Sequence, residues 1–337
     1  MHEKELQETI KHLVMKGKGI LAADESVKTA TKRLEGIGVE SSEETRRLYR
    51  QVVLAAPGME DYIAGVILYE ETLHQKTNDG IPFPKHLQNK GIVPGIKVDE
   101  GLTSFNGTGE EYTKGLDTLA ARLREFKKHG CKFTKWRAVY KISHATPSDA
   151  VIKKNAEDLA KYAKICHAEG FIPIVEPEVL IDGEHSIDQS EDVTRKVLKA
   201  LYHALKDEKV DLRYTILKPS MVISGKSASD RADVHEVAKR TLKVLKECVP
   251  KEVPSINFLS GGQTPKESTA HLNEMHKLDK ALPWRLSFSY ARALQGPALD
   301  AWRGKDENIS KAQNVFVQRC MLNSLATEGK YNSDMEN

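Results

Sequence analysis

Short apolar segments alternate along the chain with longer segments in which apolar residues recur every three or four positions. The short segments are residues 19–24, 62–69, 92–98, 131–137, 172–176, 214–218, 256–259 and 286–289. Short apolar runs bounded by turn residues are typical of buried strands. The pattern therefore predicts eight strands.

The segments between these strands predict amphipathic helices. The clearest are residues 110–129, 147–169, 190–206, 229–247 and 265–278, with charged residues on one face and Leu, Val or Ala on the other. Strands that alternate with helices pair in parallel through right-handed crossovers. Eight such units favour an α/β fold with a closed (β/α)8 TIM barrel over an open doubly wound sheet, which the pattern leaves as the alternative.

No linker, repeat or change of composition divides the chain, so we expect a single domain over residues 1–337, with extra helices at both ends. Residues 332–337 are expected to be a short, flexible end. The N-terminal residues predict a charged amphipathic helix, and no apolar run approaches the ~20 residues needed to cross a bilayer. We therefore expect a cytoplasmic protein with no membrane partner.

The charge and cysteine content exclude several other classes of protein. The net charge is only +3, from 51 Lys and Arg against 48 Asp and Glu, and both signs are mixed along the helices. This balance gives no support for a nucleic-acid partner. Four widely spaced cysteines form no C-x-x-C pair, so buried thiols are expected instead of disulfides or a zinc site: Cys131, Cys166, Cys248 and Cys320.

Ionisable or polar residues follow the apolar part of six of the eight predicted strands. They are Asp24, Lys97 and Asp99, Lys135 and Arg137, Glu176 and Glu178, Lys218, and Ser289 with Arg292. In a barrel the C-terminal strand ends form the rim of the active site. One such residue is more often a solvated group, but inward charges are costly unless they pair with one another or with a ligand. We therefore expect these residues to converge.

Lys218 is the strongest candidate for a nucleophile. It lies between Ile216-Leu217 and Pro219, in a run with little reason to hold an ammonium group. Apolar surroundings and a neighbouring cation such as Lys135 favour a neutral amine, which has the free lone pair that iminium formation requires.

Two groups of residues predict phosphate binding. Ser260, Gly261 and Gly262 follow the seventh predicted strand, and Ser289 and Arg292 lie at the eighth. The loops after these two strands often hold phosphate in this fold, although a Gly-Gly pair alone is more often only a turn. A second cationic patch is formed by Lys32, Arg33 and Lys97. Two phosphate sites across one barrel mouth indicate a bisphosphate substrate.

Seven segments that carry these residues resemble the class I, Schiff-base-forming fructose-1,6-bisphosphate aldolases. They are GILAADES (residues 19–26), GIKVD (95–99), KWR (135–137), IVEPEVL (174–180), LKPSMV (217–222), FLSGGQ (258–263) and SFSYARALQGPAL (287–299). They occur in the order of the family, and the resemblance covers the chain from about Lys11 to Tyr331. Seven ordered segments are far more specific than a single motif.

The resemblance implies a role for each matching residue. Lys218 would be the Schiff-base lysine, Glu176 the acid/base of iminium formation, and Asp24 the carboxylate that removes the C4 hydroxyl proton; Lys135 and Glu178 would support the charge network. The C1-phosphate site would contain Ser260, Gly261, Gly262, Ser289 and Arg292. The C6-phosphate end would contain Ser26, Thr29, Lys32, Arg33, Lys97 and Arg137, with Thr29 where the family usually has serine. The resemblance also implies a homotetramer.

Two alternatives to fructose 1,6-bisphosphate cleavage remain at this point. The same residues would serve an aldolase that prefers another phosphosugar, such as sedoheptulose 1,7-bisphosphate, and a non-catalytic scaffold would keep the barrel without turnover. The twelve histidines lie mostly in predicted helices, with no pair at metal-ligand spacing on a strand end. A Gly-rich dinucleotide fingerprint is also missing. We therefore expect no metal and no cofactor.

Overall fold

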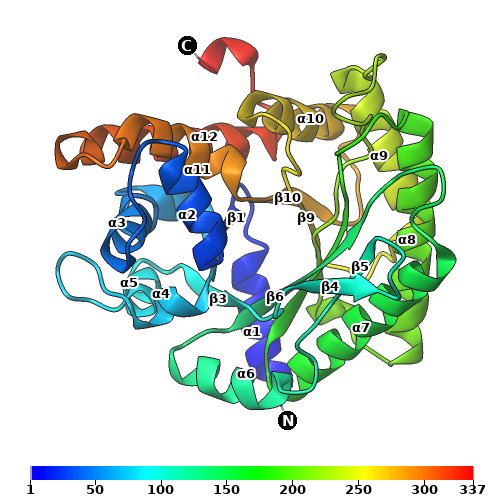
Figure 1. Ribbon diagram of the computed structural model, residues 1–337, viewed down its shortest axis with the longest axis horizontal. Coiled ribbons are helices and arrows are strands. Elements are labelled where there is room, and N and C mark those ends of the chain that lie inside the picture. The colour runs from blue at the N-terminus through cyan, green and yellow to red at the C-terminus, as the bar shows by residue number, and fades with distance from the viewer. Residues whose placement is uncertain (1, 337) are drawn as a thin grey trace.

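Eight parallel strands form a closed barrel in the computed structural model, which describes residues 2–336 (Figure 1). Around the barrel their order is β1, β10, β9, β8, β7, β6, β3 and β2. Their bounds are β1 (Gly19–Ala23), β2 (Ile63–Leu68), β3 (Val93–Lys97), β6 (Phe133–Tyr140), β7 (Ile172–Val179), β8 (Ile216–Leu217), β9 (Ser255–Phe258) and β10 (Arg285–Tyr290). All eight predicted strands are present, and the predicted (β/α)8 barrel is confirmed.

Helices surround the strands in Figure 1. They are α1 (Glu3–Leu13), α2 (Val27–Glu35), α3 (Glu43–Leu54), α4 (Glu70–His74), α5 (Phe83–Asn89), α6 (Leu119–Lys128), α7 (Asp149–Ala168), α8 (Ile187–Asp207), α9 (Val234–Cys248), α10 (Pro265–Leu278), α11 (Arg292–Trp302) and α12 (Ile309–Ala326). Side-chain oxygens of Ser148, Ser186 and Thr264 accept backbone N–H bonds at the starts of α7, α8 and α10. These caps fix where the helices begin.

One predicted helix is wrong in its first half. Residues 110–129 were expected to be continuous, but Glu110–Thr113 is strand β5, antiparallel to β4 (Leu102–Phe105), and α6 begins only at Leu119. Gly107, Gly109 and Gly115 all have positive φ angles. These positions break the helical path, so the local turn chemistry overrides the apolar periodicity that suggested one helix.

The strands divide their side chains between two apolar layers. A small cluster inside the barrel contains Ile20, Phe133, Ile172, Ile174 and Ile216. Leu6, Ile10 and Leu13 of α1 belong to the same cluster, so this N-terminal helix covers the end of the barrel where the strands begin. A larger cluster fills the space between the strands and the outer helices. The opposite, C-terminal ends of the strands are left for polar groups.

The helix composition, the cysteines and the C-terminal residues complete the description of the fold. None of the helices in residues 2–336 is long and apolar enough to cross a membrane. The four cysteines are free thiols. Residues Ser333–Glu336 form a 3-10 helix, and Glu336 pairs with Arg319 at 2.6 Å. The single domain over residues 1–337 and the flexibility of residues 332–337 stay predictions.

Gly95 on β3 is required by the aromatic ring that fills the barrel. A Cβ atom at this position would overlap the ring of Phe133. We therefore predict that Gly95→Ala destabilises the protein by about 1–3 kcal/mol through overpacking. Urea unfolding measures this free energy.

A double-mutant cycle with Phe133→Leu provides the control for this prediction. Removing part of the ring should make Gly95→Ala less costly in the double variant than in the wild-type background. Equal costs in the two backgrounds would show that contact with Phe133 is not the cause.

Candidate active site

Four buried charged residues form a chain of alternating sign at the C-terminal end of the barrel. The Lys218 amine lies 3.0 Å from one carboxylate oxygen of Glu176. The other Glu176 oxygen lies 3.2 Å from the amine of Lys135, which lies 2.6 Å from Asp24. Between 3% and 9% of each of these residues is exposed. Two cations and two anions thus compensate one another out of water, as buried charges require.

The strand period of two explains why these side chains meet. Phe133, Lys135 and Arg137 alternate with outward residues along β6, and Ile174 and Glu176 do the same along β7. Phe133 and Ile174 pack in the inner apolar cluster. The charged residues follow them toward the C-terminal ends of the strands. Lys218 comes one residue after β8, where its amide donates to the carbonyl of Val175 at 2.8 Å. The backbone therefore positions every group of the chain.

The electrostatics of the chain hold Asp24, Glu176 and Lys135 in their charged forms. Burial raises the pKa of Asp24 and Glu176, but the surrounding lysines outweigh it and lower both below their usual values. Burial lowers the pKa of Lys135, yet the carboxylates of Asp24 and Glu176 raise it well above its usual range. Glu176 contacts the amines of both Lys135 and Lys218, so a carboxylate links the two cations.

Two further ion pairs extend this polar rim. Arg137 donates to Glu178, and burial of the guanidinium is outweighed by that carboxylate, which raises the pKa of Arg137. Lys97 lies 2.6 Å from a carboxylate oxygen of Asp99. The charged side chains predicted at the ends of β1, β3, β6, β7 and β8 therefore take part in these ion pairs, whereas Ser289 and Arg292 do not.

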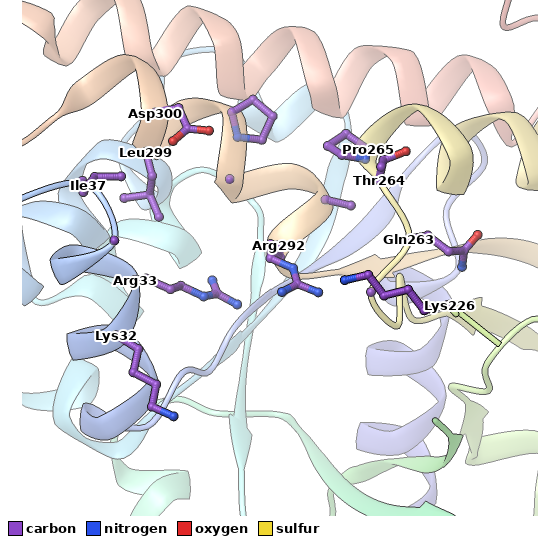
Figure 2. Close-up of a pocket in the computed structure, with 15 residues that line it drawn as sticks. Lys32, Arg33, Ile37, Lys226, Gln263, Thr264, Pro265, Arg292, Leu299 and Asp300 are labelled. Atoms are coloured by element: carbon purple, nitrogen blue, oxygen red, sulfur yellow. The ribbon is translucent and has the colours of Figure 1, made fainter. Parts of the chain in front are cut away.

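Two cavities open beside the charge chain, and we name them by one residue of each. The Arg292 cavity, of about 450 Å³, is lined by residues that include Lys32, Arg33, Lys226, Gly262 and Arg292 (Figure 2). The Lys97 cavity, of about 690 Å³, is lined by residues that include Asp24, Ser26, Lys28, Thr29, Arg33, Lys97 and Arg137. Arg33 lines both cavities, so they adjoin.

The loop after β9 contributes backbone to the Arg292 cavity. Gly261 and Gly262 have φ angles of +50° and +87°, a region that favours glycine. The amide of Gln263 donates to the carbonyl of Ser260, and the Gln263 side chain contacts His271 Nδ1 at 2.6 Å. These bonds stabilise the turn. The buried Ser289 hydroxyl on β10 has no hydrogen-bond partner within the described residues, and Ser289 is not among the residues that line the Arg292 cavity.

The structure places Lys32 in a different group from the one that the sequence predicted. This residue lines the Arg292 cavity and is not among the residues that line the Lys97 cavity with Ser26 and Thr29. Arg33 is held by Glu25 and by the hydroxyl of Tyr49, which accepts at 2.9 Å.

Two cavity lysines were not singled out from the sequence, Lys28 in the Lys97 cavity and Lys226 in the Arg292 cavity. Lys226 follows the sixth barrel strand by several residues in an irregular loop, so no periodicity marks it. Lys28 lies in the first turn of α2. In both cases the only local signal was a charge in a polar segment.

Metal-ligating side chains do not gather at this site. Across residues 2–336 there is no group of three or more His, Cys, Asp and Glu residues arranged to hold a metal ion. The expected absence of a metal and of a cofactor stays a prediction.

Lys135 is the residue that makes the buried chain neutral, and we predict that Lys135→Met destabilises the protein by about 3–5 kcal/mol at pH 7. The variant leaves two buried carboxylates close together, so their pKa values should rise. In the wild type these carboxyls have lowered pKa values in the folded state, so they stabilise it above about pH 4.5 and lose this effect as pH falls further. The acid-induced loss of stability should begin at higher pH in the variant.

Urea unfolding between pH 3.5 and 8 measures both effects. Lys153→Met is the matched control, because Lys153 is exposed and lies 3.9 Å from its partner Glu157. Identical pH profiles for the two variants would contradict the assigned role of Lys135.

Comparisons with known proteins agree with this geometry. A family model described as "Fructose-bisphosphate aldolase class-I" matches residues 5–337. A "Probable fructose-bisphosphate aldolase class 1" of Xanthomonas campestris is 50% identical, covering 98% of this chain and 99% of the relative. The cytosolic fructose-bisphosphate aldolase 5 of Arabidopsis thaliana is 51% identical, covering 97% and 91%.

A solved structure extends the similarity to three dimensions. The fructose-bisphosphate aldolase of Plasmodium falciparum, in a complex with TRAP and a small molecule inhibitor, matches with a TM-score of 0.96 at 45% sequence identity. The match covers 98% of this chain and 96% of that one.

Proposed function

The chain belongs to the class I fructose-bisphosphate aldolase family, which cleaves fructose 1,6-bisphosphate reversibly to dihydroxyacetone phosphate and glyceraldehyde 3-phosphate, and we propose that Lys218 carries this reaction as a Schiff base. The observation that carries the proposal is the buried contact of 3.0 Å between the Lys218 amine and Glu176. A carboxylate at this distance accepts a proton from the ammonium group. The lysine is then free to attack a ketone.

Glu176 is the proton carrier of iminium formation in this proposal. The Lys218 nitrogen attacks C2 of the open-chain sugar, and the C2 oxygen leaves as water after protonation. One oxygen of Glu176 contacts Lys218, and the other lies near Lys135 without a hydrogen bond of good geometry. Among residues 2–336 this second oxygen has no hydrogen-bond partner and the first lies beside the amine, which supports a role for Glu176 in passing a proton to the C2 oxygen.

Asp24 is the base for the carbon–carbon cleavage. The iminium accepts the electron pair of the C3–C4 bond, and the C4 hydroxyl loses its proton as the aldehyde forms. The pKa of Asp24 is lowered because nearby lysines outweigh its burial, so the carboxylate is ionised at neutral pH. Asp24 also lines the Lys97 cavity, on the side where C4 to C6 of the sugar would lie.

The two cavities would hold the two phosphates. We assign the C1-phosphate to Gly261, Gly262, Ser260, Ser289 and Arg292, and the C6-phosphate end to Ser26, Thr29, Lys97 and Arg137, with Arg33 between them. The unpartnered hydroxyl of Ser289 and the positive-φ glycines support the first assignment. The Lys97 cavity lining supports the second. Lys32, on the Arg292 side, goes with the first group.

We also propose an assembly state and a cell compartment, namely a homotetramer in the cytoplasm. Only the family resemblance supports a homotetramer. A cytoplasmic location is supported by the Arabidopsis relative, whose name describes it as cytosolic. A phosphorylated sugar is the only partner that we propose. We include no nucleic acid or membrane.

We predict that Asp24→Asn separates the two halves of the reaction. Cleavage of fructose 1,6-bisphosphate should fall by about 100- to 10,000-fold because the C4 hydroxyl loses its base. Dihydroxyacetone phosphate has no C4, so the variant should still form its iminium and exchange a C3 proton with deuterated water. Coupled enzyme assay and NMR measure the two rates.

Glu176→Gln is the comparison variant, because it should slow both cleavage and deuterium exchange. If Asp24→Asn lost exchange and cleavage to the same degree, Asp24 would be a structural member of the charge chain and not the base for the C4 hydroxyl.

A further inference from the structure

Lys226 lies on the loop after β8 and is held by a short backbone ladder. The amides of Gly225, Lys226 and Ser227 donate to carbonyls in the loop after β7, at 2.8, 2.7 and 3.0 Å. Three consecutive bonds fix the position of the Lys226 backbone. A lysine whose side chain only contacts solvent does not require a backbone fixed by three hydrogen bonds.

Close packing of the two loops depends on glycine. A Cβ atom on Gly225 would overlap the backbone of Gly183, so any other residue there would push the loops apart. The Ile181 side chain in the same β7 loop lies directly against Gly262. The loops after β7, β8 and β9 therefore form one packed unit. Lys226 is anchored to the β7 loop, which packs against the β9 loop that the proposed function assigns to phosphate.

The Lys226 side chain is directed into the Arg292 cavity. Figure 2 shows its amine and the guanidinium of Arg292 pointing toward one another across the open space. Lys226 and Arg292 are exposed, and within residues 2–336 neither has an ion-pair partner. Asp300 is the acidic residue among those that line the cavity. It lies on the far side of Arg292 in the view of Figure 2.

Two cations that face one another repel, and a bound anion between them removes that cost. Arg33, the other guanidinium of this cavity, is already paired with Glu25 and is less available to an anion. The cavity thus has a surplus of positive charge at Lys226, Arg292 and Lys32. A phosphate dianion matches this surplus in charge and in its number of acceptor oxygens.

We propose that Lys226 is a substrate-specificity residue that binds the C1-phosphate together with Arg292. This inference rests on the proposed function, which assigns that phosphate to the Arg292 cavity. Lys226 does not line the Lys97 cavity, so its contribution should be the same for a bisphosphate and for a sugar phosphorylated only at C1. Its effect would be to strengthen binding of C1-phosphorylated ketoses in general.

Steady-state kinetics of Lys226→Gln with two substrates tests this inference. We expect KM to rise by about three- to tenfold for both fructose 1,6-bisphosphate and fructose 1-phosphate, with the loss falling on KM instead of kcat. The difference from wild type should shrink as salt is raised, because the charge is exposed. Lys226→Arg should recover most of the affinity.

Lys266→Gln is the matched control. Lys266 is exposed in the first turn of α10, close to the same loop, but is not among the residues that line the cavity. Its variant loses the same charge, so it reports the general electrostatic effect alone.

The possible outcomes distinguish a failure of the proposed Lys226 role from a failure of the proposed function. An active wild type with equal KM values for Lys226→Gln and Lys266→Gln would overturn the role of Lys226 alone. A rise in KM for the bisphosphate but not for fructose 1-phosphate would also overturn it, because it would place Lys226 at the other phosphate. A wild type that cleaves neither substrate would contradict the proposed function, and this inference would fall with it.

Discussion

The buried contact between Lys218 and Glu176 is the interaction on which the site depends. An ammonium group and a carboxylate taken out of water are costly unless they compensate one another and their other atoms find partners. Glu176 meets this requirement by contacting Lys218 with one oxygen and approaching Lys135 with the other, and Asp24 completes the chain. The same arrangement that stabilises four charges places the proposed nucleophile, proton carrier and base within one small region.

The barrel supports this arrangement because its two ends differ: one end is filled by apolar side chains, and the other carries the charged groups. Isoleucines and Phe133 fill the interior next to α1, so the charged side chains rest on a dry, closely packed layer. Such a layer limits the ways in which the side chains above it can relax. The loops beyond the strands then carry the residues that we propose for phosphate binding, including the exposed side chains of Lys226 and Arg292.

The fold could be predicted from the sequence because its information is local. Eight apolar runs, separated by amphipathic segments, indicate a barrel, and the ionisable residues at their ends indicate which rim carries the chemistry. The β4–β5 hairpin was missed because the residues after Gly109 have a helical apolar period, whereas the pairing with Leu102–Phe105 depends on turn geometry. The glycines at positions 107, 109 and 115 were the local signal for this hairpin, and the prediction gave more weight to the apolar period.

The individual residues of the candidate site could be predicted from the sequence, but the contacts between them could not. Lys218, Glu176, Lys135 and Asp24 could each be selected as charges at strand ends, yet their alternating order depends on which strands neighbour one another in the closed sheet. The cavity that Lys32 joins, and the presence of Lys226 opposite Arg292, depend on the packing of loops that are far apart in the sequence. Pairwise geometry of this kind has no signature in composition or periodicity.

The most direct measurement of the central claim is chemical trapping of the intermediate. The protein is incubated with dihydroxyacetone phosphate, reduced with borohydride, digested and mapped by mass spectrometry. The account predicts one stable adduct, on the peptide that contains Lys218, and none on Lys135 or Lys226. An unmodified Lys218 after reduction, or an adduct on another lysine in a protein that still cleaves fructose 1,6-bisphosphate, would contradict it.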